Sequence, residues 1–133
     1  MSNPHPLNQT GIFTITTGAD GAPTVKAVLT VPAGTSIVNG TGELNQAINP
    51  PPHAPTAFTG VVHATGLGST QQIFSLQGHA IPPRLGATYI SQLVIALDGI
   101  WASKGTGSFM VYNDTPHPTV VSKALVSVEW LAQ

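Results

Sequence analysis

Eight short runs of strand-forming residues, with no helical stretch between them, limit the folds open to this chain more than any other feature. Val, Ile, Thr, Phe and Tyr are frequent in most of these runs, as in β-strands. Apolar and polar residues alternate most clearly in two runs, 24–31 and 119–131, which is typical of strands with one face in water. The runs cover residues 11–17, 24–31, 36–49, 56–65, 70–81, 88–97, 105–112 and 119–131.

Seven connections separate the runs, and each carries Gly, Pro, Asn or Asp, the residues that end strands and close turns. Connections this short cannot hold a parallel crossover, so consecutive strands should pair antiparallel in chain order. Eight strands joined in this way can close without free edges. The sequence therefore predicts an all-β fold, a small eight-stranded antiparallel up-and-down β-barrel. A two-sheet β-sandwich would show the same runs and remains the alternative.

The chain has 133 residues, a length that suits one domain with one core. We expect residues 1–10 to form a flexible N-terminal arm and residues 11–133 to form a single β-barrel domain. In the third run, Gly40 and Gly42 predict a bend or bulge at a barrel corner. A tight turn at Asn39-Gly40 is the alternative, and it would change the number of strands.

Charged residues make up 7% of the chain, with four Lys and Arg against five Asp and Glu. A chain so poor in positive charge is not expected to bind nucleic acid or an anionic membrane surface. Little repulsion keeps its copies apart, so we expect a homo-oligomer. The start of the chain has no secretory pattern, and no apolar segment reaches the roughly 20 residues of a membrane-spanning helix. We therefore expect a cytoplasmic protein.

In an up-and-down barrel, alternate connections lie at opposite ends, so four proline- and glycine-rich connections should gather at one end. Proline would stiffen these loops, which carry a large share of the ionisable residues. His53, Arg84, Asp114 and His117 are the predicted ligand-binding residues of this rim. Their imidazole and guanidinium groups could hold an anionic or sugar-like ligand. An ordinary polar loop rim is the simpler interpretation.

Other ionisable residues lie within the runs. Counting back from the proline turn at 50–55 predicts that Glu43 lies beside His63 on the adjacent strand, where a carboxylate could orient an imidazole for acid/base work. This pair would serve catalysis if both side chains faced the lumen. The alternation of the runs, however, places His63 and His79 on the outer face. With no nucleophile or second base in view, a surface hydrogen bond is the simpler interpretation.

Hydrogen-bonding residues form a broad stripe along the third to fifth runs, which suits subunit contacts, sugar hydroxyls or an ordinary wet face. The stripe consists of Asn39, Thr41, Glu43, Asn45, Thr59, His63, Ser75 and Gln77. The aromatic residues Trp101, Trp130, Tyr89 and Tyr112 could stack on a sugar ring, but packing is their more common role in strands. We expect them to pack.

The chain has no Cys and five His. Its acidic residues form no Asp-rich calcium loop, and its histidines show no two-His helical spacing for zinc. The glycine pairs precede neither a helix nor a Lys that would hold a phosphate. We therefore predict no metal and no cofactor.

Two motifs stand out in the third run and the connection after it: Asn39-Gly40-Thr41-Gly42 and Gln46-Ala47-Ile48-Asn49-Pro50-Pro51. In these motifs the chain resembles an uncharacterised family, the domain-of-unknown-function family 1842. The resemblance implies a small single-domain bacterial protein. It brings no activity and no site residue with it.

These observations favour a non-enzymatic β-barrel that works by binding. It would self-associate through its polar outer wall and bind a small ligand such as a sugar, or a protein partner, at its proline-rich end. A cofactor-free cyclase or isomerase that uses the barrel lumen is one alternative. An assembly or toxin-associated component is another.

Overall fold

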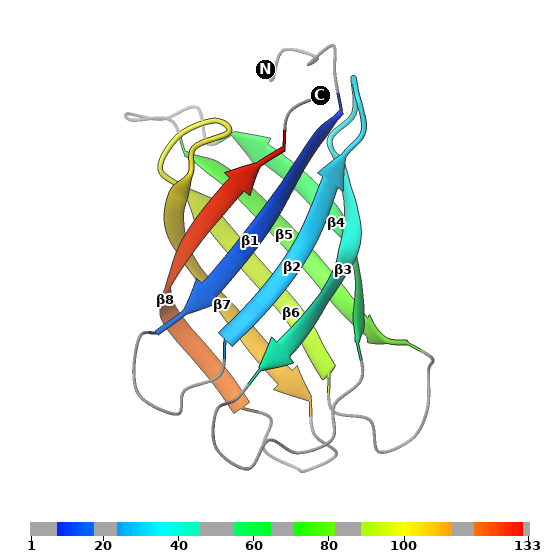
Figure 1. Cartoon of the computed structure of the whole chain (residues 1–133), viewed down its shortest axis with the longest axis vertical. Coiled ribbons are helices and arrows are strands. Elements are labelled where there is room, and N and C mark those ends of the chain that lie inside the picture. The colour runs from blue at the N-terminus through cyan, green and yellow to red at the C-terminus, as the bar shows by residue number, and fades with distance from the viewer. Residues whose placement is uncertain are drawn as a thin grey trace.

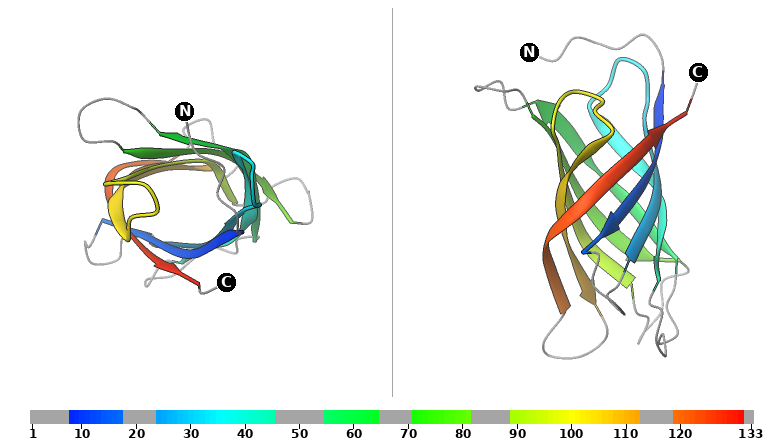
Figure 2. Two further views of the ribbon diagram at one scale, coloured as in Figure 1. Left: turned by 90° about the horizontal axis from the view of Figure 1, so that it is seen from above. Right: turned by 60° about the vertical axis from the view of Figure 1, so that its left-hand side comes forward.

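The computed structural model of the chain describes residues 8–17, 24–45, 55–64, 71–81, 89–112 and 119–131. They form eight antiparallel strands in chain order, and the sheet closes where β8 pairs with β1 (Figure 1, Figure 2). The strands are β1 (Gln9–Thr16), β2 (Thr24–Val31), β3 (Ile37–Asn45), β4 (Thr56–Ala64), β5 (Gln72–Ala80), β6 (Tyr89–Leu97), β7 (Lys104–Tyr112) and β8 (Thr119–Trp130). The predicted up-and-down barrel is confirmed, and the sandwich alternative is wrong.

Each expected run corresponds to one strand, because the alternation in sequence matches the two faces of a closed sheet. β1 begins at Gln9, so residues 9 and 10 belong to the barrel and not to the expected N-terminal arm. In β2, Val25, Ala27 and Leu29 are buried in the lumen, whereas Lys26 and Val28 are exposed on the outer wall. The buried side chains of all eight strands form one hydrophobic cluster inside the barrel. The core therefore lies in the lumen, and the outer wall is left for contacts with other molecules.

Aromatic side chains fill the centre of the barrel. Phe13 of β1 and Phe74 of β5 come from opposite sides of the closed sheet and meet edge to face, with ring centroids 5.4 Å apart. Trp130 lies 5.5 Å from Phe13, and Trp101 lies 5.3 Å from Trp130. Both Trp residues pack against the core, as expected. Since an eight-stranded barrel is just wide enough for side chains to fill, the phenylalanine pair closes the lumen in its layer.

The backbones of β2 and β3 approach closely at Gly40. β3 runs through Asn39 and Gly40 without a break, so the tight-turn alternative is wrong. A Cβ at Gly40 would overlap the carbonyl oxygen of Val28, and a Cβ at Gly42 would lie 2.8 Å from the ring of Phe58. Glycine is required at these two positions because a neighbouring strand or ring occupies the space of a side chain. Cα atoms of β3 and β6 also come within 8 Å of each other across the lumen.

Two β-bulges interrupt the hydrogen-bond ladders of the outer wall. One lies in β6 between Ile90 and Gln92, where Ser91 is the extra residue. The other lies where β7 meets β8, and there Lys123 has a φ of 58°. Bulges bend a strand and change the direction of its side chains. Each of these bulges borders a hollow in the outer wall.

Successive strands end alternately at opposite ends of the barrel, as predicted (Figure 1). The turns between β2 and β3 and between β6 and β7 lie at one end. We call the other end the loop end. It contains the strand ends that flank residues 18–23, 46–54, 82–88 and 113–118.

Candidate functional site

The four predicted rim residues, His53, Arg84, Asp114 and His117, lie outside the described residues. The strands that flank their segments all reach the loop end. The described part of a binding site at this end is therefore formed by those strands.

The predicted Glu43 and His63 pair is wrong. The β3–β4 register places Gly42 opposite Thr56, seven residues before His63, so about 20 Å of strand separates Glu43 from His63. Glu43 lies opposite Lys26 of β2 instead. Both Glu43 and His63 are exposed, so neither side chain faces the lumen.

The error in this pair has a simple physical origin. The sequence count assumed that strand pairing continues up to a short proline turn at residues 50–55. In the structure β3 ends at Asn45 and β4 begins at Thr56, so the connection is longer than that turn. A longer connection shifts the register of the whole hairpin, because loop length and pairing register are coupled.

A hollow of about 300 Å³ lies in the outer wall where β5, β6 and β7 approach the loop end. We call it the β5–β7 hollow. It is lined by Gln77, Gly78, His79, Tyr89, Ser91, Gln92 and Met110.

The sheet places the polar side chains of this hollow by alternation. Gln77 and His79 are exposed because their neighbours on β5, such as Gly78, face the lumen. Gln77 lies directly opposite Gln92 of β6, and Gln92 lies opposite Met110 of β7. Two amides from adjacent strands therefore stand side by side, and His79 follows Gln77 two residues along β5 on the same face.

The β6 bulge shapes the floor of the hollow. The Ser91 hydroxyl donates a hydrogen bond to the Met110 carbonyl oxygen, 3.2 Å away. The backbone N of Ile90 donates to Oγ1 of the buried Thr56, a residue of β4, at 3.1 Å. A Cβ at Gly78 would overlap the Ile90 carbonyl oxygen, so glycine lets β5 and β6 meet at the bulge. These contacts fix the backbone around the hollow without using the side chains of Gln77, His79 and Gln92.

Two tyrosines form the loop-end edge of the hollow. Tyr89 and Tyr112 are directly opposite each other in β6 and β7, and their ring centroids lie 5.3 Å apart. Tyr89 is half-buried against Ala80, which agrees with its expected packing role. Tyr112 is 38% exposed, so the pair also presents aromatic surface to solvent.

The β5–β7 hollow combines donors and acceptors with very little formal charge. Amides and hydroxyls both donate and accept hydrogen bonds, and a neutral imidazole does the same. Aromatic rings add a flat apolar surface beside them. This chemistry suits a ligand with several hydroxyl groups better than an ion.

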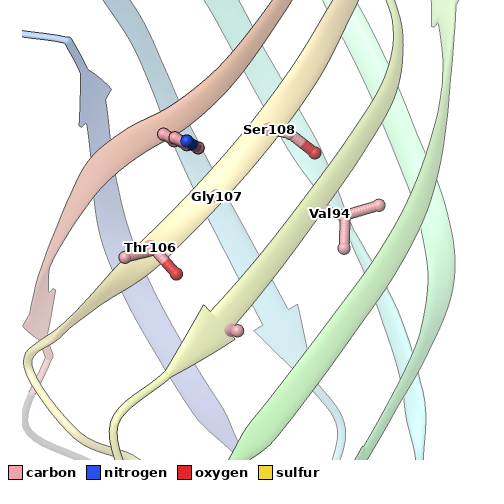
Figure 3. Close-up of a pocket in the computed structure, with 6 residues that line it drawn as sticks. Val94, Thr106, Gly107 and Ser108 are labelled. Carbon is pink, nitrogen blue, oxygen red and sulfur yellow. The ribbon is translucent and has the colours of Figure 1, made fainter.

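Two further hollows lie in the outer wall. One, of about 410 Å³, spans β1 to β3 and is lined by Ile12, Lys26, Val28, Thr41, Gly42, Glu43, Asn45 and Pro55. Its two charged residues, Lys26 and Glu43, lie opposite each other in the register, so their charges compensate locally. The other, of about 340 Å³, spans β6 to β8 and is lined by Val94, Ala96, Thr106, Gly107, Ser108 and Lys123 (Figure 3).

Among the described residues, no group of three or more His, Asp and Glu side chains could hold a metal ion. The described part of the chain also contains no helix long and apolar enough to cross a membrane.

Sequence reasoning found part of the β5–β7 hollow. All eight residues of the predicted polar stripe, Gln77 among them, are exposed, and His79 faces outward as expected. Ser91, Gln92 and Met110 were missed, because the sequence analysis treated residues 88–97 as one regular strand. The signal that could have found them is the polar pair Ser91-Gln92, which breaks the alternation at the start of β6.

A family model described as Domain of unknown function (DUF1842) matches residues 10–116. The matched region contains the strands β2 to β7 and therefore the whole β5–β7 hollow. No curated protein matches the chain.

Proposed function

Because the chain belongs to the DUF1842 family, a membership that brings no activity with it, we propose a function from the barrel itself. The protein is a non-enzymatic binding barrel that takes a small polyhydroxylated ligand, of the sugar class, on its outer wall at the loop end. Gln77, His79 and Gln92 are the residues that bind it.

The arrangement of the β5–β7 hollow carries this proposal. It brings two amides, an imidazole and a tyrosine pair to one place, on a backbone that other contacts hold rigid. Groups that both donate and accept match sugar hydroxyls, which do the same. A rigid site also lowers the entropy lost on binding.

The barrel interior favours binding over catalysis in the lumen. A lumen enzyme must enclose its substrate. Phe13 and Phe74 occupy the barrel centre, and their rings are fully buried. Glu43 and His63, the proposed acid/base pair of the cyclase alternative, are exposed and far apart.

Chain connectivity links the predicted rim to the hollow. Arg84 belongs to the segment between β5, which ends at Ala80, and β6, which begins at Tyr89. These are two of the three strands that line the hollow. Of the four rim residues, Arg84 is therefore the first to test for a further contact with the ligand.

Titration calorimetry of the purified protein, with ligands chosen from a glycan array, tests this function. We expect His79→Ala and Gln92→Ala to weaken binding at least tenfold without lowering the melting temperature, because both side chains are exposed. Asn39→Ala is the matched control, since Asn39 is an exposed amide on β3, outside the hollow. The proposal is wrong if no glycan binds, or if Asn39→Ala weakens binding as much as the hollow variants do.

A further inference from the structure

Two neighbouring rows of outward-facing residues cross the outer wall beside the β5–β7 hollow, whose Gln77, Gln92 and Met110 form the adjoining row. We call them the two-row face. The first row is Ile37, Val61, Ser75, Val94 and Ser108, paired in register from β3 to β7. The second row is His63, Ile73, Ala96, Thr106 and Leu125, paired in register from β4 to β8.

Large apolar side chains on this face are unusually exposed. Ile37 is 53% exposed, Val61 51%, Val94 41% and Leu125 62%. Ile37 and Val61 are directly opposite each other, so their exposed surfaces are continuous. A contiguous apolar patch on a soluble protein commonly marks an interaction surface.

The face has both a raised part and a recess. The recess is the 340 Å³ hollow, where β7 contributes only small side chains and Figure 3 shows Thr106 and Ser108 on either side of Gly107. Leu125 of β8 lies directly beside Thr106 and projects at the border of this recess. A projecting leucine and a hollow that has room for one therefore lie next to each other.

We propose that the two-row face binds a second copy of the chain in a two-fold symmetric dimer, in which Leu125 of each copy enters the recess of the other. A two-fold axis brings the same patch of both copies together, so such an interface must be complementary to itself. The neighbouring leucine and recess meet this requirement.

The charges favour a second copy over an unrelated partner. The ten described residues of the two-row face include no Asp, Glu, Lys or Arg. Lys123 lines the recess, and the exposed residues Asp98 and Lys104 lie two residues from Ala96 and Thr106. The long stem of each lysine lets its ammonium group reach water. With no charge on the face, nothing selects a partner of opposite charge, and two identical copies meet little repulsion.

A stable contact needs only part of this face. A standard interface covers about a tenth of a small protein's surface, and the accessible surface of this chain is 7453 Å². The two rows cross five strand-to-strand spacings of the closed eight-stranded barrel and therefore follow its curved wall, so the contact is centred on the recess that spans β6 to β8. Self-association was expected through the polar stripe, whereas the structure favours a neighbouring region that shares His63 and Ser75 with the stripe.

No residue of the β5–β7 hollow belongs to the two-row face, so the two proposals are tested with different residues. Light scattering during gel filtration is the first test. We expect the wild type to elute with twice the chain mass of 13.7 kDa. Leu125→Lys and Thr106→Trp should elute as monomers, because the first charges the projecting leucine and the second fills the recess.

Val120→Lys is the matched control, since Val120 is 61% exposed on the same strand but lies outside both rows. This variant should remain a dimer. The proposal is wrong if the wild type is monomeric, if Leu125→Lys leaves the mass unchanged, or if Val120→Lys dissociates the dimer equally.

A disulfide provides a positive test, because the chain has no Cys. In the double variant Ala96→Cys with Leu125→Cys, the two positions lie two strands apart in one copy, about 10 Å and too far for a bond within the chain. Oxidation should therefore join two chains, seen as a doubled mass on a non-reducing gel. Ala96→Cys with Val120→Cys is the control, and equal cross-linking of both pairs would overturn the proposal.

Discussion

The side-chain oxygen Oε1 of Gln72 accepts a hydrogen bond from the backbone N of Trp101, 2.9 Å away. Gln72 is one of the few buried polar residues of the described chain, and Trp101 lies in the turn between β6 and β7 with a φ of 55°. The indole of Trp130 donates to the Ala102 carbonyl oxygen in the same turn, also at 2.9 Å. Two side chains from other strands therefore hold this turn against the core, opposite the loop end.

Replacing Gln72 with Leu should lower the free energy of unfolding by about 1–3 kcal/mol, because the Trp101 amide then loses its hydrogen-bond partner in a partly buried site. Urea denaturation measures the change. Gln77→Leu is the control on the same strand, where the side chain is exposed and the effect should be small. Equal stability of the two variants would show that the buried hydrogen bond contributes nothing.

Replacing Phe13 with Ala should lower the free energy of unfolding by about 3–5 kcal/mol, because it removes a fully buried ring that contacts Phe74 across the lumen. Chemical denaturation measures this loss. Ile12→Ala removes a neighbouring side chain on the outer wall and should cost much less. Large-to-small substitutions in a core usually cost several kcal/mol of unfolding free energy. A loss below about 1 kcal/mol for Phe13→Ala would therefore mean that the barrel centre is not tightly packed.

The sequence contained enough information for the fold, because alternation and short connections are local properties. Each run needed only to turn one face inward, and antiparallel pairing in chain order followed from the length of the connections. The β3–β4 register could not be predicted from the sequence, because it depends on where β3 ends. Asn45, the last residue of β3, is followed by four more residues that look equally strand-like in sequence. The continuation of β3 through Gly40 likewise depends on how closely β2 approaches this glycine.

The candidate site was only partly predictable, because distant contacts create it. The amide of Ile90 is held by Thr56, a residue 34 positions earlier in the chain, and Gly78 makes room for the Ile90 carbonyl. Tyr89 meets Tyr112 only because the β6–β7 register brings them together. No local pattern encodes such pairings, although the outward direction of His79 does follow from alternation alone.

Replacing Gly40 with Ala should lower the free energy of unfolding by about 1–3 kcal/mol or more, because the new Cβ would overlap the backbone oxygen of Val28 and push β2 away from β3. Thermal and chemical unfolding measure the change. Gly99→Ala is the matched control, since the nearest atom to a Cβ there is 4.0 Å away. If both variants unfold alike, the close approach at Gly40 does not constrain the sheet.

The free energy of unfolding of variants at Lys123 should depend on how well the new residue adopts a positive φ. Lys123 has a φ of 58°, a conformation that costs a non-glycine residue about 1–2 kcal/mol and suits β-branched residues least. Lys123→Gly should therefore be more stable than Lys123→Val by at least about 1 kcal/mol. Because Lys123 borders the proposed dimer interface, both variants are compared by urea denaturation in the Leu125→Lys background.

The control for this prediction is the same pair of substitutions at Ser127, an exposed residue of β8 that pairs regularly with Thr14. There the order should reverse, because valine favours an extended strand and glycine weakens it. Opposite orders at the two positions would tie the effect to the bulge, which also sets the direction in which Leu125 projects. The same order at both would mean that Lys123 carries no backbone strain, and that the bulge forms equally well with any residue there.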